Sequence, residues 1–212
     1  MTIGVFHIAV GPTVHLQLAA NLIASVRRTM PGVPIAHLTD QETAPLADVD
    51  FVIRHTSRPP VALGCLDAYA HAGPGDWLFL DTDVVVQRDV RPVFDLAFDV
   101  AVATREGTLR PNEIGTKFMA RMPFNKGAVF SRCAEFWGDA VRACLTMPAK
   151  RQQWMGDQLA MNEVIDGGRY RVVVLPNTYN YPPKTRGDVD ARSKAILHFK
   201  GNRKAWALEA AA

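Results

Sequence analysis

A short apolar run that ends in two acidic residues constrains the fold of this chain more than any other feature. Trp77 to Leu80 are apolar, and Asp81 and Asp83 follow with only Thr82 between them. Such a run predicts a strand buried on both faces, as in parallel sheets covered by helices. Strand side chains alternate, so both carboxylates are expected to point the same way at the strand's carboxyl end, where open α/β sheets bind their ligands.

Two carboxylates at this spacing repel each other unless a cation lies between them. A divalent metal that also carries a phosphate ligand meets this need. A solvated turn is the alternative interpretation, because a D-x-D triplet often arises by chance. The motif alone does not decide between the two.

Strands and helices alternate along the first part of the chain. The first helix is expected near Thr13, a candidate N-cap, because apolar residues recur at every fourth position from Val14 to Met30. The alternation predicts a parallel, Rossmann-like half-domain. Its expected strands are 3–8, 35–38, 51–53 and 77–81, and its expected helices are 13–30 and 61–72.

The second part of the chain is less regular, and residues 104–123 show no clear period. No internal repeat or linker divides the sequence, and 212 residues suffice for one sizeable core, so we expect a single α/β domain. The expected strands here are 84–86, 98–103, 125–130, 171–175 and 195–199, and the expected helices are 133–145 and 154–165. Residues 182–194 are expected to form a charged loop.

Composition indicates a soluble protein of the cytoplasm. The net charge of +3, from 24 basic and 21 acidic residues, is too small to indicate nucleic-acid binding. Cys65, Cys133 and Cys144 are odd in number and lack ligand spacing, which favours reduced thiols. Residues 1–10 lack a basic leader pattern, and no apolar stretch approaches the roughly 20 residues of a transmembrane helix.

Five segments, in order over nearly the whole chain, resemble the GT-A glycosyltransferases. The resemblance is closest to the retaining family 8, which includes glycogenin-like and bacterial lipopolysaccharide galactosyltransferases. The segments are WLFLDTDVVV, FNKGAVF, GDQLAMNEV, NTYNY and HFKGNRKAW. The last is the most specific, because the family ends its catalytic domain with the form H-x-x-G-x-x-K-P-W. The resemblance implies one Rossmann-like domain over residues 1–212, with a mostly parallel central sheet flanked by helices.

Within that domain, the resemblance implies a nucleotide-binding half at 1–83 and a donor-sugar and acceptor half at 84–212. The implied reaction moves a hexose from a nucleotide-diphosphate sugar to a glycan or lipid-linked acceptor, with retention of configuration. The donor is expected to be a UDP-hexose from family frequency alone, because residues 9–15 lack the Asp and Tyr that often hold uracil. The acceptor is expected near residues 104–123.

The resemblance also assigns a metal centre. Asp81 and Asp83 would hold Mn²⁺ or Mg²⁺, with His198 as the third protein ligand. Imidazole together with carboxylates suits Mn²⁺ somewhat better than Mg²⁺. The metal would act as a Lewis acid on the departing nucleoside diphosphate.

Further site residues follow from the same motifs. Asp157 and Gln158 match the pair that the family places under the anomeric carbon, and Asn125 matches the amide that binds the donor sugar. A helix-capping Asp157 and a turn-forming Asn125 are the structural alternatives. The remaining residues expected to bind the donor are Lys204, Gly201, Ile8, Ala9 and Thr82.

For the mechanism, we favour front-face attack stabilised by Gln158 over double displacement by Asp157.

Two other functions fit parts of the sequence. A haloacid-dehalogenase-type phosphatase would use Asp81 as nucleophile and Asp83 as acid/base. That family normally places this strand near its N-terminus, whereas 80 residues precede Asp81 here. A non-catalytic nucleotide-sugar-binding module is the second alternative.

Overall fold

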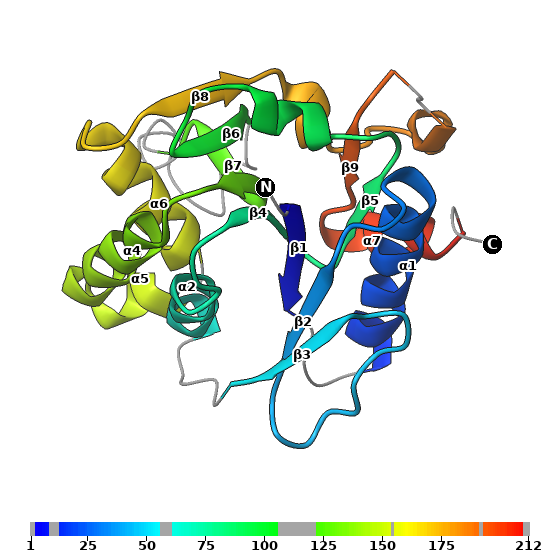
Figure 1. Cartoon of the computed structure of the whole chain (residues 1–212), viewed down its shortest axis with the longest axis horizontal. Coiled ribbons are helices and arrows are strands. Elements are labelled where there is room, and N and C mark those ends of the chain that lie inside the picture. Colours follow the sequence, from blue (N-terminus) through cyan, green and yellow to red (C-terminus); the bar gives the residue numbers. More distant parts are fainter. Residues whose placement is uncertain are drawn as a thin grey trace.

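The computed structural model, which describes residues 3–8, 13–55, 61–105, 122–153, 155–190 and 193–209, is built around a seven-stranded sheet (Figure 1). The strand order is β3-β2-β1-β4-β7-β6-β8. The strands are β1 (Ile3–Ile8), β2 (Ile35–Thr39), β3 (Phe51–Arg54), β4 (Asp76–Leu80), β6 (Val100–Thr104), β7 (Phe124–Ser131) and β8 (Val172–Leu175). Two short strands, β5 (Val84–Val86) and β9 (Ile196–His198), form a separate antiparallel ribbon.

Helices cover both faces of the large sheet, which confirms the predicted α/β class. Figure 1 shows α1 and α7 together on one side of the molecule and α2, α4, α5 and α6 on the other. The α-helices are α1 (Thr13–Thr29), α2 (Val61–Ala70), α4 (Ala134–Thr146), α5 (Ala149–Gln153), α6 (Gly156–Asp166) and α7 (Lys204–Glu209). The 3₁₀ helices are η1 (Arg91–Asp95), η2 (Asn177–Tyr179), η3 (Arg186–Asp190) and η4 (Gly201–Arg203). Among the described residues, no helix combines the length and apolar character needed to cross a bilayer.

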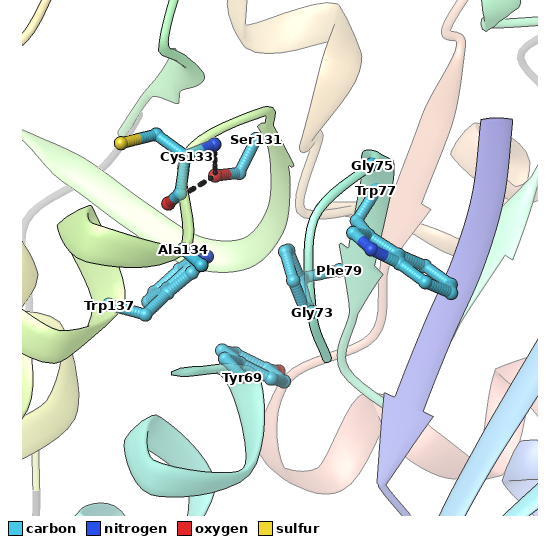
Figure 2. A pocket seen from close by; sticks show the side chains of 9 residues that line it. All are labelled: Tyr69, Gly73, Gly75, Trp77, Phe79, Ser131, Cys133, Ala134 and Trp137. Atoms are coloured by element: carbon cyan, nitrogen blue, oxygen red, sulfur yellow. Dashed lines mark hydrogen bonds between the residues drawn. The ribbon is translucent and has the colours of Figure 1, made fainter. Parts of the chain in front are cut away.

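The side chains of β4 are divided between two hydrophobic cores, as a strand buried on both faces requires. Leu78 and Leu80 pack in the core that α1 covers, whereas Phe79 packs in the core that α2, α4 and α6 cover. Figure 2 shows Phe79 with Tyr69 and Trp137 around it. The ring centroids of Tyr69 and Trp137 lie 4.5 and 5.1 Å from that of Phe79. This aromatic group fixes α2 and α4 against the centre of the sheet.

The sheet is mostly parallel, but β7 runs antiparallel to both of its neighbours. The sequence predicted that both neighbours of β4 would run parallel to it. This prediction is correct for β1 but wrong for β7, which runs antiparallel to β4. The reversal brings the first residues of β7 to the edge where β4 ends, because Leu80 pairs with Ala128. The Asp81 N–H then donates to the Gly127 carbonyl, at 3.0 Å. Segments 80–83 and 125–127 therefore meet at one edge.

The predicted origin of the two carboxylates needs a correction. Strand β4 ends at Leu80, so Asp81 and Asp83 lie in the turn between β4 and β5. Strand alternation therefore does not align their side chains. The chain leaves the large sheet because β5 pairs with β9 instead, and this pairing orients the turn.

Other differences are smaller. The helix expected over 154–165 begins at Gly156, and the loop expected over 182–194 contains the 3₁₀ helix η3. Helices α5 and α7 were not predicted, because each has only five or six residues and therefore shows no usable apolar period.

Candidate active site

Asp81, Asp83 and His198 meet at one point, although His198 is 115 residues beyond Asp83 in the sequence. The ribbon explains the meeting, since Val84 pairs with His198 across β5 and β9. His198 Nε2 lies 3.2 Å from Asp83 Oδ1 and 3.9 Å from Asp81 Oδ2. The predicted ligand set is thus assembled by a ladder of three residue pairs.

Each carboxylate turns one oxygen toward His198 and gives the other to a lysine. Asp81 Oδ1 lies 3.0 Å from Lys126 Nζ, and Asp83 Oδ2 lies 3.1 Å from Lys204 Nζ. Burial opposes ionisation of Asp83, but the charges of His198 and Lys204 hold its pKa well below the usual range. Two carboxylate oxygens and one imidazole nitrogen therefore converge.

This donor set fits a divalent cation. The three side chains each offer one ligand atom, and these atoms lie within 4.8 Å of one another. In octahedral coordination with bonds of about 2.1 Å, neighbouring ligand atoms lie about 3 Å apart, so a small contraction closes the set. One nitrogen and two oxygens match Mn²⁺ and, less well, Mg²⁺.

A second shell of hydrogen bonds sets the tautomer of His198. Its Nδ1 lies 2.8 Å from Asn180 Oδ1, which only accepts, so Nδ1 carries a proton and Nε2 is the nitrogen that a bound cation would take. The orientation of the Asn180 amide is fixed in turn, because its Nδ2 donates to Asn125 O and Oδ1 at 3.0 and 2.8 Å.

The hydrogen bonds continue through buried amides to Gln158. Asn125 Nδ2 donates to Gln158 Oε1 at 2.6 Å, and Asn125 Oδ1 also accepts from the Gly127 N–H at 3.0 Å. The side chains of His198, Asn180, Asn125 and Gln158 thus form a continuous chain, which we call the amide chain. All four residues are buried. Asn125 does more than form a turn, because its side chain joins β7 to α6 and to Asn180.

Lys126 is the cation that the sequence reasoning missed. Its ammonium group lies between Asp81 and Asp157, 3.0 and 3.3 Å from one oxygen of each, and 3.4 Å from the Tyr69 hydroxyl. The residue is only 6% exposed. Burial disfavours its charge, but Asp81, Tyr69 and Asp157 keep the Lys126 pKa well above the usual value. A permanently charged lysine therefore links the acidic pair to the start of α6.

Asp157 lies in the first turn of α6 but is not its cap. The N-cap is Met155, which has a left-handed backbone with φ of 63°, and Asp157 Oδ1 accepts from the Gln158 N–H at 2.8 Å. The capping interpretation of Asp157 is therefore wrong. Its other oxygen faces Lys126.

The remaining predicted residues lie around this centre or outside the described chain. Thr82 is part of the β4–β5 turn, and Ile8 ends β1, one residue past the pair between His7 and Leu80. Gly201 has a φ of +60°, which favours glycine, at the start of η4. Ala9 lies outside the described residues, as do 106–121 of the segment expected to bind the acceptor.

A second positive group near the acidic pair also escaped the sequence reasoning. Lys200 is within reach of Arg105, Asp81 and Asp83. Burial and the neighbouring Arg105 charge lower the Lys200 pKa to about 8. Lys200, Lys126 and Asn180 all stand inside the quoted motifs HFKGNRKAW, FNKGAVF and NTYNY, so the signal was present and only their roles were missed.

The comparison with solved structures addresses the fold. The glycosyltransferase GlyE of Streptococcus pneumoniae TIGR4 superposes with a TM-score of 0.68 at 14% identity, over 99% of this chain and 61% of GlyE. The galactosyltransferase LgtC, solved with donor and acceptor sugar analogues, gives 0.65 at 13%, over 98% and 93%. A glycosyltransferase that acts in glycosylation of the major capsid of PBCV-1 gives 0.66 at 14%, over 100% and 98%.

The chain has the GT-A glycosyltransferase fold. It spans about three fifths of GlyE, the first of these structures. No protein-family model matches the sequence. No curated protein matches it either. At these identities the likeness concerns the fold alone.

Proposed function

We propose that the protein is a metal-dependent glycosyltransferase that moves a hexose from a nucleotide-diphosphate sugar to a glycan or lipid-linked acceptor, with retention of configuration. One observation carries the proposal. Asp81, Asp83 and His198 converge next to the buried amide chain, at the carboxyl edge of a sheet with the GT-A fold. Ligands of open α/β sheets bind at this edge.

Asp81, Asp83 and His198 would hold the Mn²⁺ or Mg²⁺ ion, whose positive charge would stabilise the departing nucleoside diphosphate. Lys204 and Lys200 add positive charge beside the same carboxylates. The left-handed backbone at Gly201 leaves space at a Cβ position, which suits close approach of phosphate oxygens to the main chain.

Gln158 and Asn125 would contact the donor sugar. Gln158 Nε2 faces the Met122 thioether at 3.7 Å, a weak acceptor that a sugar hydroxyl can replace. Asp157 is ion-paired with Lys126, which makes it a poorer nucleophile and supports front-face attack. In that mechanism the acceptor's hydroxyl proton passes to the leaving diphosphate while Gln158 stabilises positive charge on the sugar.

UDP as the nucleotide remains an inference from family frequency. The acceptor is also proposed from the resemblance alone. Residues 104–123 carry Arg105, Arg110, Lys117 and Arg121 against only Glu106 and Glu113, an excess of positive charge that suits an anionic acceptor such as a phosphorylated glycan or lipid-linked sugar. A solvated surface loop is the alternative explanation of these charges.

The test is thermal unfolding with a panel of nucleoside diphosphates and nucleotide sugars, with and without Mn²⁺. A ligand at a hundred times its dissociation constant stabilises a protein by about 2.7 kcal/mol. We expect one nucleotide to raise the Tm only with Mn²⁺, and the double variant Asp81→Asn/Asp83→Asn to lose the effect. Asp89→Asn, which removes an exposed acid paired with Arg91, is the matched control. No response to any nucleotide would refute the proposal.

Turnover separates an enzyme from a binding module. We expect sugar transfer or slow hydrolysis of the nucleotide sugar that stabilises the wild type. Gln158→Ala should bind that donor yet lose most turnover, and full activity in this variant would refute its role as a stabiliser. Donor binding without any release of nucleoside diphosphate would instead identify a binding module.

A further inference from the structure

A second group of metal-ligating side chains lies away from the candidate active site, where the end of β3 meets α2. His55 directly follows β3, Asp67 belongs to α2, and His71 directly follows α2. The His71 N–H donates to the Asp67 carbonyl at 3.1 Å, which continues the helical turn. Asp67 and His71 are therefore four residues apart on one helical face, a spacing that suits two ligands of one metal.

Both imidazoles face the same carboxylate. His55 Nε2 lies 3.0 Å from Asp67 Oδ2, and His71 Nδ1 lies 3.7 Å from Asp67 Oδ1. His71 Nδ1 also donates to the Asp67 main-chain carbonyl at 2.7 Å, so a metal would take this nitrogen only after it gives up its proton, or Nε2 after the ring rotates. The two rings lie 6.0 Å apart between centroids. One protonated histidine would satisfy the carboxylate as an ion pair, whereas a second protonated ring would repel the first. Two neutral imidazoles and a carboxylate around one divalent cation satisfy all three groups.

The spacing matches a tetrahedral site. With bonds of about 2.0–2.1 Å to nitrogen and oxygen, the ligand atoms of tetrahedral Zn²⁺ lie about 3.3 Å apart. The measured separations of 3.0 and 3.7 Å run to different oxygens of Asp67, so small side-chain movements would bring one oxygen to this spacing from both rings. Each of the three side chains offers a ligand atom within 4.8 Å of the others. The His71 side chain is 66% exposed, so its ring can rotate to shorten the longest separation.

The group also lines a cavity of about 510 Å³, whose wall further includes Arg54, Leu63, Val141 and Leu145. His55 Nδ1 is buried without a hydrogen-bond partner. A change of tautomer would move the ring proton to this nitrogen, and a ring flip would turn it toward a bound metal. Three protein ligands leave the fourth position open toward the cavity, where the Arg54 charge favours an anionic ligand or hydroxide.

We propose that His55, Asp67 and His71 form a second metal site that binds Zn²⁺ or a similar transition-metal ion, with one coordination position open to this cavity. Two imidazoles and one carboxylate select such ions over Ca²⁺ and Mg²⁺, which prefer oxygen ligands alone. The proposal does not depend on the proposed glycosyltransferase function, because it shares no residue with the candidate active site.

The test measures Zn²⁺ binding by equilibrium dialysis in the full chain and its variants. We expect the wild type to bind two equivalents of Zn²⁺. Asp83→Asn should keep only the equivalent bound at His55, Asp67 and His71. The double variant Asp83→Asn/His71→Ala should lose that equivalent as well. His71 is largely exposed, so its replacement leaves the fold intact, and circular dichroism checks this. His15→Ala, a histidine of α1, is the matched control in the same Asp83→Asn background.

Asp67→Asn supplies an independent loss of one ligand. Asp67→Asn and His71→Ala should each weaken Zn²⁺ binding at this site by tenfold or more. His15→Ala should leave the Zn²⁺ affinity of the site unchanged. Co²⁺ provides a spectroscopic check, since a tetrahedral site with histidine ligands gives a visible absorption that the His71→Ala variant should lack. Equal Zn²⁺ stoichiometry and affinity in Asp83→Asn with and without His71→Ala would overturn the proposal.

Discussion

Gly127 packs so closely against His198 that the candidate active site has no space for a Cβ atom at this position. A Cβ at this position would overlap the His198 imidazole, and it would also lie 3.0 Å from Asn125 Oδ1. The absence of a side chain at Gly127 therefore places the histidine ring between the acidic pair and Asn180. Its role is steric, since its backbone does not require a left-handed conformation.

We predict that Gly127→Ala abolishes the Mn²⁺-dependent rise in Tm, because the His198 ring is displaced from the carboxylates. Thermal unfolding with and without Mn²⁺ measures the effect. Gly138→Ala is the control, because its added Cβ meets only the end of Arg142, at 3.8 Å, and lies within a helix. That control should gain about 0.5–1 kcal/mol. A full Mn²⁺ response in Gly127→Ala would contradict the assigned role of His198.

Lys126 supports a second prediction at the same scale. Without metal, Lys126→Met should lower the free energy of unfolding by about 2–4 kcal/mol, because Asp81 and Asp157 lose their shared cation. The loss is moderated because Asp81 is partly exposed to water. Mn²⁺ should restore more stability to this variant than it adds to the wild type, since it replaces the missing charge. Urea unfolding with and without Mn²⁺ measures both quantities. An equal metal increment in both proteins would refute this electrostatic account.

The sequence predicted the residues that meet in the site better than the contacts that hold them there. The motifs named Asp81, Asp83 and His198, and the structure brings these together. The roles of Lys126 and Asn180 were missed although both residues stand inside quoted motifs, because neither residue type by itself indicates one chemical role. Their roles depend on which long-range neighbours the fold supplies, and a pattern of residues along the chain does not contain that information.

At the scale of elements, β2, the second strand from one edge of the large sheet, contains a buried histidine. All five residues of β2 are buried, His37 among them. Burial, together with the charge of Arg54, lowers the His37 pKa to about 4. Between about pH 6.5 and pH 4 the unfolded chain therefore takes up a proton that the folded chain excludes, so this histidine lowers stability as the pH falls.

We predict that this contribution has a maximum slope of about 1.4 kcal/mol per pH unit in that interval. His37→Leu should remove it, so that the difference between variant and wild type increases in favour of the variant as the pH falls from 7 to 4.5. Urea unfolding at several pH values gives both curves, and their difference cancels the contributions of shared acidic groups. Parallel curves would show that His37 does not resist protonation in the folded state.

The elements themselves were largely predictable, but their directions were not. Apolar runs and helical periods located β1 to β4, α1 and α2 closely. Burial accounts for the apolar pattern of β2, β4 and α1, whereas the apolar run of β3 is mostly exposed at the edge of the sheet. The reversed direction of β7 could not be predicted, because a strand buried on both faces has the same composition whichever way it runs. That direction places Asn125 and Lys126 at the active edge.

At the scale of the molecule, the candidate metal centre joins distant parts of the chain. Its ligands come from the turn after β4 and from β9, and its supporting residues come from β7, α6 and the segment around Asn180. A bound cation would therefore link the turn after β4 directly to β9, in addition to the short β5–β9 ribbon. Ligand binding raises the free energy of opening for the regions that it ties together.

We predict that Mn²⁺ slows amide hydrogen exchange in β5 and β9 by tenfold or more, while β3 at the sheet edge stays unchanged. Hydrogen-exchange mass spectrometry of the wild type measures both regions. Asp83→Asn should show no metal effect in either. Equal slowing in β3 and the ribbon would indicate general stabilisation of the fold instead of a local link.

The pairing of β5 with β9 also determines when the candidate metal centre can assemble. A ribosome makes Asp81 and Asp83 long before it makes His198, so a nascent chain carries two of the proposed ligands without the third. The ribbon that completes the set can form only after β9 has left the ribosomal exit tunnel. A partly synthesised chain therefore lacks the assembled metal centre, and the order of translation itself keeps the proposed activity off until the sheet and its helices have been made.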